Sequence, residues 1–323
     1  MLLGLILTLG AFGGSPITEI LPTLGIFAVA LLQLMSPLGT IGSLRIELVA
    51  ALPRAELAHY SITGPIPMRK DGHLILKSFE DKILFSNVSF AHRNRDNLFN
   101  QIDLAFEKGK VTAIVGVSGS GKSTLIKLLM KYYSPIEGDV FLGTHKLDNV
   151  SQKTWRSICG VVMQEGYIFN DTIAHNIAIG EDYIDKEKLA KAVDIANIKD
   201  FIESLPLSYN TKIGMEGIGL STGQKQRLLI ARAVYKDPKY LFFDEATSAL
   251  DANNEKTIIE KLNSFFEDRT VIVVAHRLST VRHADQIVVL DQGRIIELGN
   301  HAKLIEKKGA YYNLVKNQLE LGK

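Results

Sequence analysis

The sequence contains little cysteine and little net charge. Cys159 is the single cysteine among 323 residues, so no internal disulfide can form, which suits a reducing cytosol. Because Cys159 lies in an apolar stretch, we expect a small core residue rather than a nucleophile. Lysine and arginine number 37 against 35 acidic residues, a net charge of +2, so nothing indicates a nucleic-acid-binding surface. The sequence also shows no internal repeat and no low-complexity tract.

Charge is nearly absent from residues 1–44, where Glu19 is the one charged side chain. The stretch Ile20 to Met35, extended through Leu44, is long and apolar enough to span a bilayer. Met1 to Gly14 is apolar but too short for a straight spanning helix. A secretory signal peptide would carry lysine or arginine before its apolar run, and the first such residue is Arg45. A buried helix of a soluble protein is the remaining alternative.

Basic residues follow this span and place its C-terminal side in the cytoplasm, because positive charge favours that side. We expect the helix to kink or end at Pro53. Residues 63–82 contain glycine, proline and mixed charge and are interpreted as a linker. The basic residues are Arg45, Arg54, Arg69 and Lys70.

A glycine-rich segment, GVSGSGKST, fits the P-loop pattern of phosphate-binding proteins. Its glycines let the backbone approach a phosphate, and successive N–H groups form an anion-binding nest. Residues 110–115 are predicted as a buried strand and residues 124–130 as a helix, which argues against a chance turn. Lys122 is expected to reach the β- and γ-phosphates, and Ser123 to ligate Mg²⁺. The expected nucleotide contacts are Gly116, Ser118, Gly119, Ser120, Gly121, Lys122, Ser123 and Thr124.

Two adjacent acids follow a second apolar run, Tyr240-Leu-Phe-Phe243, which is typical of a strand buried on both faces. Placing carboxylates at the end of a buried strand costs free energy, unless they bind a cation or take part in proton transfer. Asp244 suits the Mg²⁺ shell, and Glu245 suits a general base that orients the attacking water. Capping of the next helix is the alternative role for these two acids.

Five motifs in order, GVSGSGKST, VVMQE, LSTGQ, LFFDEATSALD and VVAHRLST, resemble the nucleotide-binding domain of an ABC transporter from about residue 83 to the end. The resemblance implies an α/β fold, a P-loop NTPase of the ABC ATPase type. Its mostly parallel sheet core, β-rich subdomain and helical subdomain would be preceded by one to two transmembrane helices. The resemblance also implies that ATP and Mg²⁺ are bound.

Further roles follow from the resemblance, position by position. Gln164 would touch Mg²⁺ and sense the membrane domain, and His276 would lie close to the γ-phosphate. Ser221, Gly223 and Gln224 belong to the signature that would contact ATP held by a second subunit, and Ser248 to Asp251 would cross the dimer interface. The implied catalytic residues are Lys122, Gln164, Glu245 and His276, and the implied metal ligands are Ser123, Gln164 and Asp244.

Each of these residues also has an ordinary structural interpretation. Gln164 could be a solvated polar residue, His276 a residue at a strand end, and Ser221 a helix N-cap. Three positions depart from the family pattern. Thr222 replaces the usual signature glycine, His92 stands where an aromatic ring usually stacks on adenine, and Met215 replaces an acid that here follows as Glu216.

The coarse pattern divides the ATPase part into three regions. Residues 83–115 are predicted to be β-rich, residues about 165–235 mostly helical, and residues 236–298 strands alternating with helix. Leu189, Ala192, Val193 and Ala196 share one helical face by their spacing. Asn300 is predicted to cap the terminal helices.

The resemblance predicts the domain order: residues 1–62 a partial exporter transmembrane domain, 63–82 a linker, and 83–323 an ABC nucleotide-binding domain. A complete exporter subunit usually carries six membrane helices, so the chain resembles the C-terminal portion of a longer protein. We expect an ATP-hydrolysing exporter subunit that works as a homodimer. The expected location is the inner (plasma) membrane, multi-pass in the full-length protein, with the ATPase domain in the cytoplasm.

The prediction of the transported substrate rests on a weaker resemblance than the prediction of the ATPase domain. Phrases such as GVVMQEGYIFNDTIAHNIA resemble bacterial exporters of bacteriocin-like peptides that carry a peptidase domain, so we expect a transported peptide. Export of a lipid, an oligosaccharide or a drug stays open. So do a soluble ABC ATPase of DNA repair or translation and a truncated remnant that binds ATP without transport.

Overall fold

The computed structural model describes residues 17–63, 71–76, 82–92, 96–214, 217–245, 252–275 and 281–321. The chain divides into two compact units, Met1–Lys70 and Asp71–Lys323. Several expectations fall outside the described residues: those on Met1 to Gly14, on Met215 and Glu216, on the segment ending at Asp251, and on His276.

The described part of the first unit, residues 17–63, forms one long helix, α2 (Ile17–Thr63), of 47 residues. At 1.5 Å per residue its length is about 70 Å, more than twice the hydrocarbon thickness of a bilayer. Leu24–Thr63 is long and apolar enough to cross a membrane by length and composition, with a window of mean hydropathy 1.8.

The helix passes through Pro22, Pro37 and Pro53 and reaches Thr63, so the expectation that Pro53 could end it is wrong. Each proline removes one backbone hydrogen bond, but the turns before and after it keep theirs. A helix of this length therefore tolerates such isolated losses.

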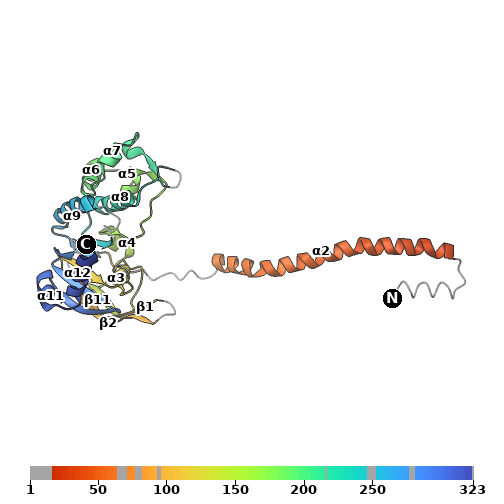
Figure 1. The fold of residues 1–323 in the computed structure, drawn as a ribbon, viewed down its shortest axis with the longest axis horizontal. Helices are drawn as coiled ribbons and strands as arrows, with labels where there is room; N and C mark the ends of the chain where they lie inside the picture. The colour runs from red at the N-terminus through yellow and green to blue at the C-terminus, as the bar shows by residue number, and fades with distance from the viewer. Residues whose placement is uncertain are drawn as a thin grey trace. The chain divides into compact units, whose positions relative to one another are not determined.

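The second unit is built around a six-stranded sheet with the order β12-β11-β3-β10-β9-β6 (Figure 1). Its strands are parallel except β12, which returns antiparallel beside β11. Every residue of β9 and β10 is buried, as expected of strands covered on both faces. The mostly parallel core is therefore confirmed. The strands are β3 (Val111–Gly116), β6 (Cys159–Val162), β9 (Tyr240–Asp244), β10 (Thr270–Val274), β11 (Gln286–Asp291) and β12 (Arg294–Gly299).

A second, antiparallel sheet forms the β-rich part, with the order β2-β1-β4-β5. Its buried residues share one core with α3 (Lys122–Leu129) and with Trp155 of α4 (Gln152–Ser157). Cys159 belongs to the same core, which confirms its predicted packing role. The elements are β1 (Ile83–Ala91), β2 (Asn97–Phe106), β4 (Glu137–Leu142), β5 (His145–Lys146) and the short helix η1 (Leu147–Asn149).

The middle of this unit is helical, as predicted. Leu189, Ala192 and Val193 lie buried on one face of α6, and Ala196 follows them at its end. Figure 1 shows these helices gathered at one end of the unit, with β1 and β2 at the other. The elements are β7 (Asp171–Thr172), α5 (Ile173–Ile177), α6 (Lys186–Ile195), α7 (Lys199–Glu203), η2 (Ser208–Asn210), β8 (Lys212–Ile213) and α8 (Thr222–Tyr235).

Three further helices lie in the part of this unit that the structure describes. Asn300 caps α11 by accepting from the Lys303 backbone, which confirms the predicted cap. The start of the last helix is bonded by Glu297, whose carboxylate accepts from the backbone N–H groups of Ala310 and Tyr311. The helices are α9 (Ala252–Phe266), α11 (His301–Lys307) and α12 (Ala310–Leu321).

Candidate nucleotide site

The glycine-rich loop joins the centre of the parallel sheet to α3. Strand β3 lies between β10 and β11 and ends at Gly116, and α3 begins at Lys122. Gly121 precedes the helix with φ of +105°, and a Cβ there would lie 2.5 Å from Cε1 of Phe99. Only glycine fits both the left-handed conformation and the contact with Phe99. The loop therefore closes tightly against β2.

The amine of Lys122 lies on this loop. Its Nζ donates to the carbonyl oxygens of Gly116, at 3.0 Å, and Val117, at 2.9 Å. Burial lowers the pKa of Lys122, while the charges of Glu245 and Asp244 act to raise it. The Ser120 hydroxyl is buried and has no hydrogen-bond partner in the described part of the chain. A cation and an unsatisfied hydroxyl at a loop of backbone N–H groups fit a phosphate ligand.

Two oxygen groups meet where α3 approaches β9. Ser123 Oγ donates to Asp244 Oδ1 at 2.9 Å, and Asp244 is 3% exposed. Burial raises the pKa of the Asp244 carboxyl and the nearby Glu245 raises it further, whereas the bond from Ser123 lowers it. A hydroxyl and a carboxylate side by side are the hard oxygen ligands that suit Mg²⁺. Two of the residues expected to hold Mg²⁺ thus lie in direct contact.

Glu245 lies where three segments of the chain converge. Its backbone has a positive φ of 53°, its N–H donates to Val274 O at 3.2 Å, and its carbonyl accepts from Gln226 Nε2 at 2.9 Å. Its carboxylate accepts from Gln164 Nε2 at 3.2 Å. The structure thus brings Gln164 to Glu245 although 81 residues separate them. Gln226 was not anticipated, since a glutamine inside an amphipathic helix gives no signal of its partner.

The signature segment begins helix α8. Ser221 is the N-cap: its Oγ accepts from the Gln224 N–H at 3.2 Å, and Gln224 Oε1 accepts from the Ser221 N–H at 2.9 Å. This reciprocal pair is a capping box, so the structural interpretation of Ser221 holds in this geometry. Thr222 is the first helical residue, where ordinary helical angles suffice and glycine is not needed. Gly223 follows in the same first turn.

His92 lies among aromatic rings. Its ring meets Phe90 edge-on at 5.0 Å and Tyr133 edge-on at 5.4 Å, while Phe90 and Tyr133 stack at 5.2 Å. Tyr133 follows the C-terminal end of α3 and was not anticipated as a neighbour of His92. The sequence does show a pair of tyrosines, Tyr132 and Tyr133, after the predicted helix. Nothing in the sequence pattern, however, indicates that this pair lies near residue 92.

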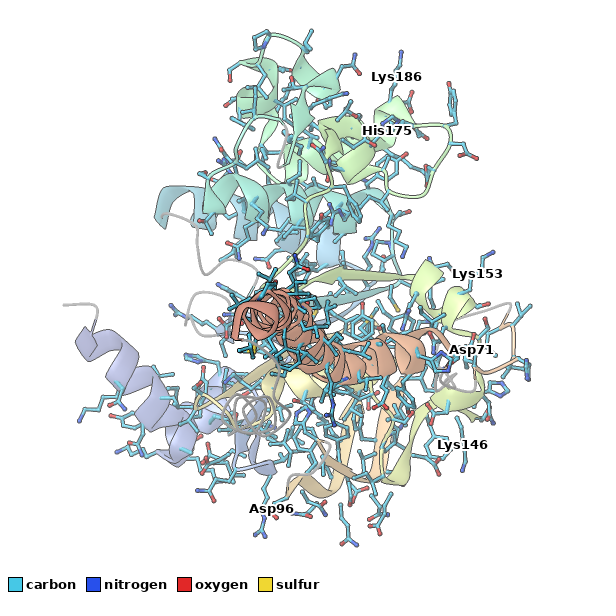
Figure 2. The ribbon with its side chains drawn as sticks, turned by 90° about the vertical axis from the view of Figure 1, so that its right-hand side faces the viewer. Asp71, Asp96, Lys146, Lys153, His175 and Lys186 are labelled. Carbon is cyan, nitrogen blue, oxygen red and sulfur yellow. The ribbon has the colours of Figure 1, made fainter. Side chains whose placement is uncertain are left out.

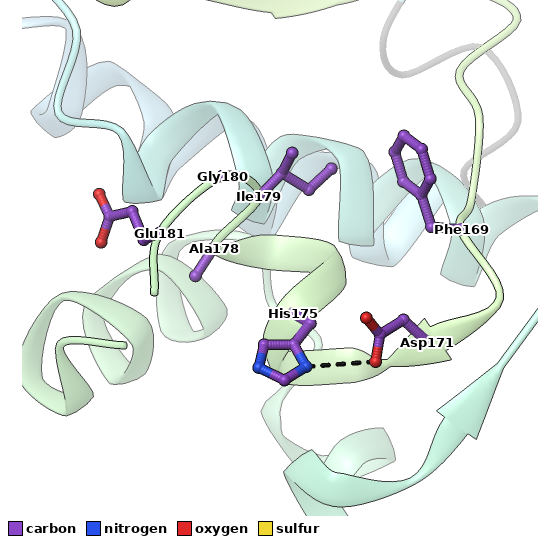
Figure 3. Close-up of a pocket in the computed structure, with 7 residues that line it drawn as sticks. All are labelled: Phe169, Asp171, His175, Ala178, Ile179, Gly180 and Glu181. Atoms are coloured by element: carbon purple, nitrogen blue, oxygen red, sulfur yellow. Dashed lines mark hydrogen bonds and ion pairs between the residues drawn. The ribbon is translucent and has the colours of Figure 1, made fainter. Parts of the chain in front are cut away.

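A surface pocket of about 320 Å³ opens on the helical part (Figure 3). The side chains of Asp171 and His175 lie next to each other in its lining, with Asp171 Oδ1 3.2 Å from His175 Nδ1. The Thr172 backbone N–H lowers the pKa of Asp171, and the His175 contact adds to that effect. The neighbouring Asn176 is fully buried, and its side chain accepts from the Phe169 N–H and donates to the Phe169 carbonyl. The pocket is lined by Phe169, Asp171, His175, Ala178, Ile179, Gly180 and Glu181.

Comparisons with known proteins agree with this geometry. Residues 99–248 match the family model described as ABC transporter. An ABC multidrug transporter of Emericella nidulans is 45% identical over 252 residues, 77% of this chain and 19% of that protein. An ATP-dependent lipid A-core flippase of Cupriavidus metallidurans is 40% identical over 292 residues, 89% of this chain and 49% of that protein.

A solved structure gives the same result for the fold. A bacterial Atm1-family ABC exporter with ATP bound superposes with a TM-score of 0.74 at 35% identity, covering 90% of this chain and 51% of that one. The chain spans about half or less of the length of the relatives it matches.

Proposed function

Because the chain carries a P-loop NTPase domain of the ABC transporter type, we propose that it is the ATP-hydrolysing part of an ABC exporter. The observation that carries this proposal is the convergence at the P-loop: Ser123 bonds Asp244 while the adjacent Glu245 bonds Gln164. A hydroxyl–carboxylate pair suited to a cation and a carboxylate suited to act as a base thus lie side by side at the end of β9.

Roles follow from chemistry and position. The loop N–H groups and Lys122 would bind the ATP phosphates, and Ser123 with Asp244 would hold Mg²⁺, which neutralises phosphate charge when bound. Glu245 would accept a proton from the attacking water. Gln164 would keep the Glu245 carboxylate oriented and, on the family pattern, contact the membrane domain.

A second copy would complete the site. Ser221 and Gly223 lie at the start of α8 in the helical part, and on the family pattern they contact ATP bound to the other subunit. We propose a homodimer in the plasma membrane, multi-pass in the full-length protein, with the ATPase domain in the cytoplasm. The long apolar helix α2 supports attachment to the bilayer.

Cargo is a separate question from ATP hydrolysis. The relatives include a lipid A-core flippase and a multidrug transporter, so proteins of different named cargo share this ATPase domain. Function at the cargo site cannot be inferred from a shared domain that does not contact cargo. Peptide export stays a prediction, to be tested by transport assays with labelled peptide against lipid and drug substrates.

The test of ATP hydrolysis is Glu245→Gln. The amide keeps the size of the side chain but cannot take a proton, so turnover should fall by about 10² to 10⁴-fold while ATP affinity stays unchanged. Phosphate release, ATP titration and gel filtration with ATP would show slow turnover, intact binding and a trapped dimer. Glu260→Gln, at an exposed glutamate of α9, is the matched control. Wild-type turnover in Glu245→Gln would refute the assignment of the base.

A further inference from the structure

Residues 71–76, which we term the strap, lie against the segment that leads into α4. The Leu74 N–H donates to Asn149 O at 2.9 Å, and the Leu74 carbonyl accepts from Ser151 N at 2.9 Å. These two bonds form an isolated parallel bridge beside Val150. The side chains of Leu74 and Leu76 pack against the core below the β-rich sheet. The strap is thus fixed through its backbone and its apolar side chains.

Close approach at one point requires glycine. A Cβ added to Gly72 would lie 2.2 Å from the carbonyl carbon of Asn149. Such a distance is far inside van der Waals contact with backbone that cannot rotate away. Any larger residue at position 72 would therefore lift the strap from the 147–152 segment.

An ion pair fastens the beginning of the strap. Asp71 Oδ1 accepts from the backbone N–H of Gln152, the first residue of α4, at 2.9 Å, and lies 3.8 Å from Lys131 Nζ. Figure 2 marks the position of Asp71. The Lys131 side chain is only 3% exposed, and its amine also donates to the carbonyls of Asp148 and Val150. A buried ammonium needs such partners because desolvation is costly. Asp71 supplies an anionic partner for this ammonium.

Lys131 lies directly after the P-loop helix. Helix α3 starts at Lys122 and ends at Leu129, so the ion pair fastens the strap to the end of the helix whose other end carries the phosphate loop. Trp155 Nε1 of α4 donates to Leu129 O at 2.7 Å, which ties α4 to the same end. A short helix of eight residues, about 12 Å long, then separates Asp71 from the nucleotide loop.

We propose that Asp71 and Lys131 are positioning residues that link strap docking to nucleotide binding. The inference rests on the proposed function and adds to it a link between the strap and the P-loop. In sequence, only residues 64–70 separate α2 from the strap. A change at the docked strap would reach α3 through the ion pair and through the Trp155 bond. Because binding linkage is reciprocal, nucleotide at the P-loop must stabilise the docked strap by the same factor.

The experiment measures both sides of this linkage in the full chain. In wild type, AMP-PNP with Mg²⁺ should slow hydrogen exchange of the Leu74 and Ser151 amides by about fivefold, the lower range of allosteric coupling. Asp71→Asn keeps an oxygen for the Gln152 N–H but removes the charge, and should weaken AMP-PNP binding by about fivefold. Gly72→Ala should weaken binding similarly without altering any charge.

Asp139→Asn is the matched control, because it removes a carboxylate from an exposed pair with Lys146 at 2.7 Å and touches no strap residue. It should change neither exchange at the strap nor affinity. Faster strap exchange in Asp71→Asn with affinity unchanged would overturn the inference, since the strap would then be a structural attachment only. Strap exchange indifferent to AMP-PNP in wild type would overturn it as well. Absence of AMP-PNP binding by the wild type would refute the proposed function itself.

Discussion

Glu245 has a backbone conformation that its neighbours must maintain. A non-glycine residue with positive φ is held at a cost of about 1–3 kcal/mol and persists only where surrounding contacts fix it. One of those contacts is the bond from Gln226 Nε2 to the Glu245 carbonyl at 2.9 Å. Gln226→Met keeps the length of the side chain and removes the donor. The lost bond is worth about 1 kcal/mol, and the buried carbonyl left without it adds to the loss.

We expect this loss to appear as slower turnover. A free energy of 1–1.4 kcal/mol corresponds to roughly a five- to tenfold fall in the fraction of Glu245 held in position, and hence in kcat. The KM for ATP should stay within twofold, because the bond that the substitution removes holds the backbone of Glu245 and not the P-loop. Phosphate-release kinetics over a range of ATP concentrations separate the two parameters.

Two results would contradict this reasoning about Gln226. An unchanged kcat would show that the other contacts of Glu245 suffice to hold it. Equal losses in kcat and ATP affinity would indicate general damage to the fold. Gln286→Met is the matched control: it removes a glutamine whose amide oxygen accepts from Thr112 at 3.2 Å and does not bond Glu245. It should leave kcat within twofold of wild type.

Two further predictions concern binding and stability. Lys122→Ala should abolish measurable ATP binding, because it removes the cation at the loop; unchanged affinity by titration would count against the phosphate cradle. Burial raises the pKa of Tyr235, and its hydroxyl donates to Glu181 at 2.7 Å. The neutral tyrosine is thus favoured in the folded state, and its share of stability is present below the ordinary value of 10.0 and lost as pH rises through the higher folded pKa. Urea unfolding at pH 9 and 11 should show a smaller alkaline loss for Tyr235→Phe than for wild type; equal losses would refute the assignment.

Prediction from the sequence succeeded where residues of recognisable chemistry lie next to the strand or helix that positions them. The P-loop lies between a strand and a helix that are adjacent in sequence, so its geometry follows from local pattern. Asp244 follows an apolar run that could only be a buried strand, and parallel neighbours place its end beside the loop. The sequence predicted both Ser123 and Asp244 as Mg²⁺ ligands, and the structure places the two side chains in direct contact.

Other contacts could not be read from the sequence, for physical reasons. The strap bonds a segment about 75 residues away through backbone atoms, which every residue type possesses. Tyr133 reaches His92 because the segment after α3 folds back to β1, which no periodicity encodes. Pro53 was overestimated as a helix breaker, since its local cost is small against the many bonds of a 47-residue helix.

The position of Glu245 depends on contacts with both the parallel sheet and the helical part of the second unit. Its N–H is bonded by β10 of the sheet, while its carbonyl is bonded by α8, the same helix that Ser221 caps. Gln164, which follows β6, bonds its carboxylate. A displacement of α8 relative to the sheet must therefore strain the backbone of Glu245, because the two bonds to it would no longer be satisfied together. The proposed base would then keep this position only when the helical part lies in one arrangement, so we expect a partner that shifts α8 to displace Glu245 as well.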